Sequence, residues 1–330
     1  MATANQTTTN NPTIDLAEAV RRLGGKPVAA AFKQTVIQAS NLSSTQTKIW
    51  LDPKIKNKLA LAISSGKHVY LYGPPGVGKS TVCRAVLEGT GKDFLRFQFH
   101  SSTTADDLIG TLAPSATGGF QYQWSPILEA CDSGTPCIME EVNSLRAEHS
   151  FPLFSLLDHT PWYDVVLAGK ERRITKKDGW QAFVTGNDNG SGDKAHLFGG
   201  SEIMNRALLE RFAYFIKMEY LPKPMEQEMI IEKTGLKDAK LLDALLNVAT
   251  ETRKLAADDP SRAELAISPR TVLEWATAYV ITKQGNIKLD HRQIAEMAVV
   301  DRLPDSCRDT VLTAVDNKFA GIDISKIQTT

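Results

Sequence analysis

The sequence predicts an α/β domain, with a parallel sheet between two layers of helices, followed by a lid domain made of helices. Three observations support this fold class. A glycine loop separates a strand pattern from a helix pattern within residues 68–88, strand and helix patterns alternate after it, and only helix patterns follow residue 221. Leu221-Pro222-Lys223-Pro224 marks the boundary, because its prolines interrupt regular structure. We therefore expect the α/β domain to span residues 49–221 and the helical lid, with the C-terminal helices, to span residues 222–330.

The first 48 residues precede this alternation. Residues 1–13 are polar and rich in Thr and Asn, which predicts a disordered tail and differs from the basic and apolar pattern of a secretory signal. Residues 14–48 contain two short amphipathic patterns, which predict a helical leader. A helix over Lys54–Ser64, with Pro53 in its first turn, then opens the α/β domain.

The glycine loop is the most specific motif in the chain. It fits the pattern G-x-x-x-x-G-K-[S/T] without a mismatch, after a predicted strand at His68–Tyr72 and before a predicted helix at Thr81–Glu88. Glycine backbone N–H groups and a helix N-terminus attract phosphate, Lys79 would reach the outer phosphates of ATP, and the Ser80 hydroxyl would bind Mg²⁺. A chance glycine turn before a helix is the alternative. The predicted nucleotide-binding residues are Gly73, Pro74, Pro75, Gly76, Val77, Gly78, Lys79, Ser80 and Thr81.

Two later core strands end in polar side chains. Glu140 and Glu141 follow the strand pattern at residues 136–139, and Asn187 follows the pattern at Trp180–Thr185. Ligands bind α/β sheets at the carboxyl ends of their strands. We expect Glu140 to hold Mg²⁺ through a water, Glu141 to polarise the attacking water, and Asn187 to contact both the γ-phosphate and that water. The alternatives are a solvated acidic strand end and a simple turn.

Three arginines are candidates for contact with the phosphates. Arg206 and Arg211 lie in a predicted helix at Ile203–Phe212, and Arg270 lies in the first turn of a predicted lid helix. A guanidinium is always charged and suits phosphate oxygens, so Arg211 is a candidate arginine finger for a neighbouring subunit. Arg270 would report the nucleotide state to the lid. Surface ion pairs and simple exposure are the alternatives for these side chains.

Two hairpins are expected within the α/β domain. Leu112–Trp124 contains turn residues before an aromatic strand pattern, and Tyr163–Leu167 pairs with Arg172–Thr175. The basic run at residues 170–177 is compatible with nucleic-acid binding, but we favour a solvated hairpin. A glycine-rich segment at residues 188–200 is expected to be mobile.

The remaining elements follow from periodicity. Strands are expected at Phe94–Phe99 and Ala213–Met218. Helices are expected at Pro126–Cys131, Arg146–Asp158, Met225–Thr234, Ala239–Ala256, Pro269–Thr282, His291–Val299 and Thr310–Phe319.

Composition limits the classes of partner. Lys plus Arg and Asp plus Glu both number 38, so the formal net charge of zero argues against nucleic acid or an anionic membrane as the main partner. No apolar run is long enough to span a bilayer. The four cysteines match no disulfide or zinc spacing, which favours buried thiols in a reducing, cytoplasmic compartment.

Together these motifs resemble AAA+ ATPases, and within them the MoxR-type and CobS-type, dynein-related group. The resemblance covers about Ile49–Tyr279. Beyond the phosphate loop it rests on Asp107–Gly110, Trp124–Ala130, Glu140–Asn143, Asn187 as sensor 1, Leu208–Phe212 as the arginine-finger segment and Ser268–Arg270 as sensor 2. Gly190–Asp193 with Leu197–Gly200 resembles the insertion of the CobS branch.

The resemblance implies a homo-oligomeric ring, usually a hexamer, that hydrolyses ATP with Mg²⁺. Such proteins remodel a partner or drive metal insertion, often with a partner that carries a von Willebrand factor A domain or with a chelatase-like subunit. The two hairpins would face the pore of the ring. The family usually has Asp where this chain has Glu140. Because of that departure, slow hydrolysis is one alternative, and a scaffold whose assembly depends on nucleotide is a second. A nucleic-acid motor is a third alternative.

Overall fold

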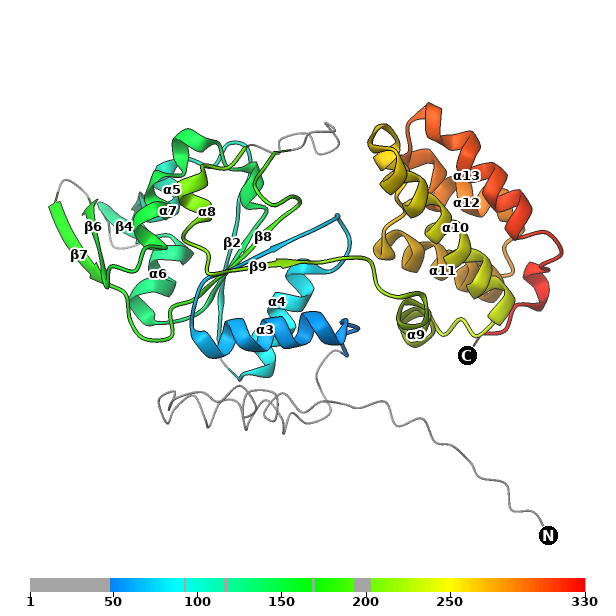
Figure 1. Cartoon of the computed structure of the whole chain (residues 1–330), viewed down its shortest axis with the longest axis horizontal. Helices are drawn as coiled ribbons and strands as arrows, with labels where there is room; N and C mark the ends of the chain where they lie inside the picture. The colour runs from blue at the N-terminus through cyan, green and yellow to red at the C-terminus, as the bar shows by residue number, and fades with distance from the viewer. Residues whose placement is uncertain (1–47, 92, 116–117, 168–169, 193–202, 330) are drawn as a thin grey trace, which may run out of the picture.

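The computed structural model describes residues 48–91, 93–115, 118–167, 170–192 and 203–329. The predicted tail (1–13), the predicted leader up to residue 47 and residues 193–200 of the glycine-rich segment lie outside these ranges. Figure 1 shows an α/β part and a helical part, connected by the segment that follows β9.

A five-stranded sheet forms the centre of the α/β part. Its order is β2 (Leu95–Gln98), β5 (Cys137–Glu140), β8 (Ala182–Gly186), β1 (Val69–Tyr72) and β9 (Tyr214–Lys217). Every neighbouring pair is parallel. The three central strands, β5, β8 and β1, therefore have their carboxyl ends next to one another on the same side of the sheet, and a ligand would bind there.

Helices cover both faces of this sheet, because the side chains of each buried strand alternate between the faces. Val69 and Leu71 pack with α3 (Pro53–Ser65) and α4 (Lys79–Gly89), while Tyr70 packs with the helices of the other face. Those helices are α5 (Ala105–Ile109), α6 (Pro126–Ser133), α7 (Phe151–Leu156) and α8 (Arg206–Leu209). The predicted three-layer α/β fold is confirmed.

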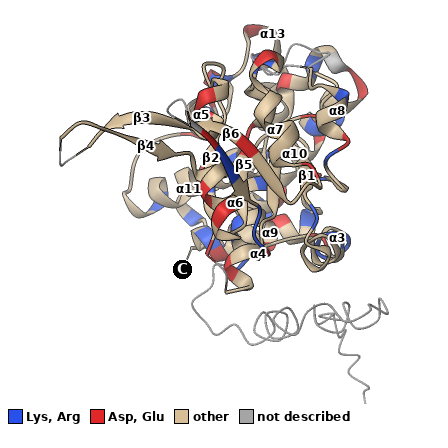
Figure 2. Cartoon of the chain, turned by 90° about the vertical axis from the view of Figure 1, so that its left-hand side faces the viewer, with Lys and Arg blue, Asp and Glu red and all other residues tan. Residues whose placement is uncertain are grey.

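Both predicted hairpins are present. β3 (Gly110–Pro114) pairs with β4 (Phe120–Trp124), and β6 (Trp162–Leu167) pairs with β7 (Lys170–Thr175), each pair antiparallel. The β3–β4 hairpin extends away from the body of the molecule in Figure 2, and the Phe120 side chain in it is 72% exposed.

Two predicted helices are shorter than expected. The pattern at Arg146–Asp158 forms one 3₁₀ turn, η2 (Ala147–His149), before α7, and a further 3₁₀ turn, η1 (Val142–Ser144), precedes this range. Pro152 has no N–H to donate, so a helix must begin at about that point. Helix α8 begins at Arg206, because the Asn205 side chain accepts a hydrogen bond from the N–H of Ala207 and caps it.

The helical part has its own apolar core. The ring of Trp275 stacks on Phe319 with centroids 5.4 Å apart, and Tyr279 stacks on Phe319 at 6.0 Å. Its elements are α9 (Lys223–Thr234), α10 (Ala239–Asp258), η3 (Pro260–Leu265), α11 (Pro269–Gln284), α12 (His291–Ala298), η4 (Val300–Arg302), α13 (Asp305–Lys318) and η5 (Ile324–Lys326). Among the described residues, no helix has the length and hydropathy needed to cross a membrane.

Candidate functional site

The phosphate loop has a backbone that only glycine accommodates easily. Gly73, Gly76 and Gly78 have φ angles of 149°, 74° and 90°, which are unfavourable for other residues. A Cβ on Gly73 would lie 2.1 Å from the carbonyl oxygen of Met218, and one on Gly76 would lie 2.6 Å from the Ser268 side chain. Gly78 precedes α4 without a side-chain cap, so the first N–H groups of α4 remain for an anion. The loop is thus a cradle for phosphate.

Lys79 joins this cradle to the end of β8. Its side chain is buried, and its Nζ donates to the carbonyl oxygens of Gly73 at 2.7 Å and Pro74 at 3.0 Å. It also donates to Oδ1 of Asn187 at 3.1 Å. The structure therefore brings together two groups that sequence analysis assigned to one site.

The pKa of Lys79 shows which other charges lie near it. Burial lowers this pKa to about 8, the nearby Glu141 carboxylate raises it, and the nearby Arg270 guanidinium lowers it further. Lys79 is desolvated because it is buried, and the neutral carbonyl and amide oxygens around it replace only part of its hydration. A phosphate group placed here would restore favourable charge interactions for the ammonium.

Asn187 is held in place by Asn143, which sequence analysis did not select as a site residue. The Oδ1 of Asn143 accepts hydrogen bonds from the Asn187 N–H at 3.1 Å and from the Tyr70 hydroxyl at 2.9 Å. A Cβ on Gly186 would lie only 1.9 Å from that oxygen. Asn143 follows Glu141 by two positions and closes the Glu140–Asn143 motif, and that place in the motif was the sequence signal for it.

Glu141 has a strained backbone. Among the described residues, Glu141 (φ 61°) and Asn286 are the non-glycine residues with positive φ. The Glu141 N–H donates to Oγ1 of buried Thr185 at 3.3 Å, and its Oε2 accepts a long hydrogen bond of 3.4 Å from Nε2 of Gln98. Backbone strain of this kind is concentrated at functional sites, and here it turns an exposed carboxylate toward the strand ends.

Glu140 is buried and already paired. Its carboxylate forms an ion pair with Arg96 of the neighbouring strand β2, a partner that sequence analysis missed. The pKa of Cys83 in α4 is raised, first by burial and then by the nearby charge of Glu140. The Glu140 carboxylate therefore lies near α4, the helix that begins with Lys79 and Ser80. Hydroxyl and carboxylate oxygens are ligands that Mg²⁺ prefers, and Ser80 with Glu140 fits that chemistry.

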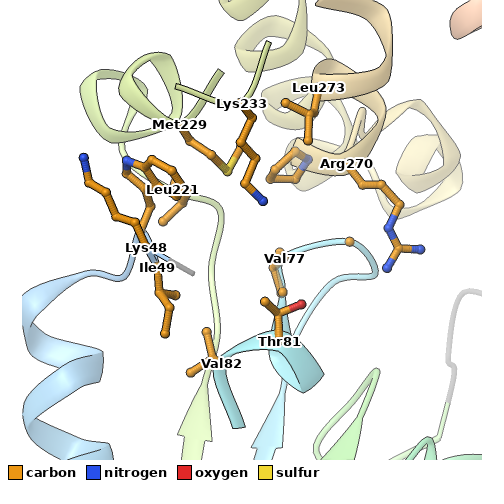
Figure 3. Close-up of a pocket in the computed structure, with 14 residues that line it drawn as sticks. Lys48, Ile49, Val77, Thr81, Val82, Leu221, Met229, Lys233, Arg270 and Leu273 are labelled. Atoms are coloured by element: carbon orange, nitrogen blue, oxygen red, sulfur yellow. The ribbon is translucent and has the colours of Figure 1, made fainter. Parts of the chain in front are cut away.

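A cavity of about 250 Å³ extends from the phosphate loop to the helical part. Figure 3 shows Val77 and Thr81 on one side of it, and Met229, Lys233 and Leu273 on the other. Its walls are mainly apolar; they also include Lys48, Ile49, Trp50, Leu221 and Pro269. Sequence analysis had selected Val77 and Thr81, but it missed Lys48, Ile49, Trp50, Leu221, Met229, Lys233 and Leu273 as lining residues, because they form no motif and come from distant parts of the chain.

Arg270 lies where this cavity meets the phosphate loop. It follows Ser268, whose Oγ caps α11 by accepting a hydrogen bond from the Thr271 N–H at 3.2 Å. The Arg270 side chain extends from α11 beside the loop in Figure 3, and its Cβ is 3.6 Å from the position of a Cβ on Gly76. Its exposure leaves the guanidinium able to meet a phosphate.

The two arginines predicted in the helix at Ile203–Phe212 are placed differently: Arg206 begins α8, and Arg211 lies just after its end. The Arg206 side chain is 92% exposed and lies 3.5 Å from Glu210, an ion pair that sequence analysis gave as the alternative. Arg211 donates to the carbonyl oxygens of Phe154 at 3.2 Å and Ala207 at 2.5 Å, and its guanidinium stacks on the Phe154 ring. Within the described residues, no hydrogen bond or ion pair joins either arginine to the phosphate loop of its own chain.

Comparison with known proteins agrees with this geometry. Residues 68–212 match the AAA domain of the dynein-related subfamily. The chain is 26% identical over 239 residues to the aerobic cobaltochelatase subunit CobS of a Sinorhizobium species, covering 68% of this chain and 71% of CobS. It is 25% identical over 190 residues to midasin of Dictyostelium discoideum, covering 56% of this chain and 3% of midasin.

Solved structures resemble the chain more distantly. RuvB, the Holliday junction branch migration motor of Thermotoga maritima, is 14% identical, with 83% of this chain and 71% of RuvB covered and a TM-score of 0.41. A TM-score this low supports no argument about function.

The chain carries an AAA domain of the dynein-related subfamily, and its predicted place in the MoxR/CobS-like group of AAA+ ATPases is confirmed.

Proposed function

We propose that this chain is an ATP-hydrolysing motor of the MoxR/CobS type that works as a homo-oligomeric ring. The observation that carries the proposal is the contact of Lys79 with both the phosphate loop and Asn187, in the field of Glu141 and Arg270. Groups from three neighbouring strand ends and from the lid thus converge on one place.

The hydrolytic step follows from the roles of these residues. The oxygen of a water attacks the γ-phosphorus, the bond to the β–γ bridging oxygen breaks, and the Glu141 carboxylate accepts the proton of the water. Asn187 orients the water and the γ-phosphate, since its Oδ1 accepts from Lys79 while its Nδ2 can donate. A positioned base of this kind contributes a factor of about 10² to 10⁴ in rate.

Mg²⁺ would neutralise charge on the phosphate oxygens, with the Ser80 hydroxyl and the Glu140 carboxylate holding it, Glu140 through a water. The chain's own part is to orient the Glu140 carboxylate, and the ion pair with Arg96 would do so.

The cavity beside the loop would receive the base of the nucleotide. Apolar side chains of Ile49, Leu221, Met229 and Leu273 line it, and flat heteroaromatic rings bind well between such side chains. The cavity lies between residues 48–50 and the lid, so bound ATP would touch both parts of the chain.

A neighbouring subunit would complete the site. We propose that Arg211, which lies just after α8, acts together with Arg206 at the start of α8 on the nucleotide of the adjacent subunit in a hexameric ring. Support comes from their position at α8, where neither side chain contacts its own phosphate loop within the described residues. Arg211 would have to exchange its carbonyl partners for phosphate on assembly.

The partner would be a chelatase-like subunit or a protein with a von Willebrand factor A domain, through which the ring remodels its client or drives metal insertion. The similarity to a cobaltochelatase subunit supports this proposal. Nucleic acid is disfavoured by the zero net charge, and both kinds of charge are spread over the face shown in Figure 2.

One observation favours a second candidate, a scaffold whose assembly depends on nucleotide while turnover is slow. Glu140 replaces the usual Asp and is engaged by Arg96, which would weaken its hold on Mg²⁺. Steady-state phosphate release and light-scattering mass, measured together with and without ATP and Mg²⁺, separate the two. Turnover by an ATP-dependent ring supports the motor, whereas an ATP-dependent ring without phosphate release supports the scaffold.

A further inference from the structure

A buried ion pair lies in the helical part, away from the phosphate loop. Arg253 of α10 donates to both carboxylate oxygens of Glu226 in α9, each at 2.7 Å. The side chains of Glu226 and Arg253 are only 1% and 10% exposed. Removing two charges from water is expensive, and such a pair is often no more stabilising than apolar side chains of the same size. Its presence therefore suggests a role beyond stability.

The same guanidinium makes two further contacts. Its Nε donates to the carbonyl oxygen of Ile267 at 2.7 Å, and its Cζ lies 4.4 Å from the centre of the Tyr220 ring. Arg253 thus connects α9 with two irregular segments, one before α9 and one before α11. Only the planar, five-donor guanidinium can make a bidentate carboxylate contact, a carbonyl contact and a stacking contact at once.

Each of these three segments also forms part of the nucleotide site. Leu221, next to Tyr220, lines the cavity, as do Met229 and Lys233 of α9. Ile267 directly precedes Ser268, which leaves no room for a Cβ on Gly76 of the phosphate loop. Arg253 therefore contacts both the segments that line the lid side of the cavity and the segment that leads into the first turn of α11, where Arg270 lies.

We propose that Arg253 is a positioning residue of the nucleotide site. It fixes the connecting segment, α9 and the start of α11 relative to one another, so that Ser268 and Arg270 meet the phosphate loop. The inference rests on the proposed nucleotide-binding function and names a residue outside the site that shapes it. It acts through Arg270 and Ser268, and it does not touch the nucleotide.

The substitution Arg253→Lys tests this directly. Lysine keeps the charge opposite Glu226 but cannot also hold the Ile267 carbonyl and stack on Tyr220 in the same way. With a fluorescent ATP analogue and Mg²⁺ as the probe, we expect the full chain to bind about tenfold more weakly. The matched control is Val311→Ala, in the core of the lid on a helix that does not line the cavity. We expect that variant to lose thermal stability without losing affinity.

A double-mutant cycle distinguishes positioning from a general loss of order. If Arg253 acts through Arg270, then Arg253→Lys should change the affinity less than twofold when Arg270→Ala is already present. A full tenfold loss in that background, or an Arg253→Lys affinity equal to that of the Val311→Ala control, overturns the inference. Absence of binding by the wild-type chain would instead overturn the proposed function.

A second variant keeps the test decisive if Arg253→Lys does not fold. Tyr220→Leu removes the stacked ring and leaves the buried ion pair intact. We expect a loss of affinity of about threefold, since only one of the three attachments is removed. An affinity equal to that of the wild type would overturn the proposal.

Discussion

The phosphate loop and the α8 region (Arg206–Arg211) both carry cations that ATP hydrolysis would use, but they hold them in opposite ways. Lys79 is buried and donates to groups of its own site, and burial lowers its pKa to about 8. Arg206 is almost fully exposed, and Arg211 is bound to carbonyl groups that belong to no phosphate site. Under the proposed function, the single chain would thus offer a site for the ground state of the nucleotide and leave Arg206 and Arg211 outside that site.

This difference has a physical reason. A buried lysine can be prepared in advance because its neighbours are in the same chain and the helix dipole of α4 favours the incoming anion. An arginine that must reach another subunit cannot be buried before assembly. The comparison predicts that damage to the phosphate loop abolishes binding, whereas damage to α8 spares binding and removes turnover.

The largest expected effect is that of Lys79→Ala. It removes the ammonium group that donates hydrogen bonds within the phosphate loop. Nucleotide binding and phosphate release should therefore both fall below detection. Equilibrium binding of a fluorescent ATP analogue checks this. Lys58→Ala, at an exposed position of α3, is the matched control and should bind like the wild type. Retained binding by Lys79→Ala would mean that the cradle is not the site.

The next largest effect is that of Arg211→Ala, which should reduce turnover about 10³-fold and leave binding within about threefold, because an arginine finger acts on the transition state.

Mixing two kinds of variant subunit tests whether neighbouring subunits share a site. Arg211→Ala and Glu141→Gln subunits, each inactive alone, should regain phosphate release when mixed, because one type supplies the base and the other supplies the arginine.

Arg206→Ala alone shows which of the two arginines is decisive, because it should keep more turnover than Arg211→Ala if Arg211 is the finger. No recovery of phosphate release in the mixture of Arg211→Ala and Glu141→Gln subunits contradicts an in-trans role for Arg211. Such a result would place the cation of the transition state within its own chain.

Glu141→Gln should come third. Loss of the base should lower phosphate release about 10²-fold, while ATP binding survives because the cradle is unchanged. Single-turnover phosphate release measures this, with Glu148→Gln, at an exposed glutamate of η2, as the control. Wild-type hydrolysis by Glu141→Gln would assign the base to another group.

A smaller effect is expected from pH. Because the pKa of Lys79 is lowered to about 8, the free protein loses this charge above pH 8, and ATP affinity should fall by up to about tenfold between pH 8 and pH 9. Between pH 8 and 10.5 the unfolded chain binds more protons at this residue, so its contribution to the unfolding free energy rises with pH. Lys79→Arg, which stays charged, should show no such decline in affinity; a flat wild-type profile would contradict the burial effect.

The smallest effect is expected from Arg96→Gln. It frees the Glu140 carboxylate from its ion pair, so the Mg²⁺ concentration needed for half-maximal nucleotide binding should fall about two- to fivefold. Titration of Mg²⁺ at fixed nucleotide measures this. An unchanged Mg²⁺ requirement would show that Arg96 and the metal do not compete.

Much of the α/β part could be predicted because its signals are local. The phosphate-loop motif needs only adjacent residues, and β1, β5 and β8 are short buried runs that end at Tyr72, Glu140 and Gly186. The predicted starts of two helices, at Arg146 and Ile203, were too early. Apolar periodicity begins before Pro152 and Asn205, but these two residues decide where each helix begins.

The sequence by itself determined the fold class, the phosphate cradle and the carboxylates and amide at the strand ends, since each depends on neighbouring residues. Only the tertiary structure decided the partners: Asn143 for Asn187, Arg96 for Glu140, and Arg253 for the lid side of the cavity. These pairs join segments distant in the chain, and in one sequence nothing specifies which charged or polar side chain will meet which. Their pairing follows from the order of strands in the sheet and from the way helices pack on each other.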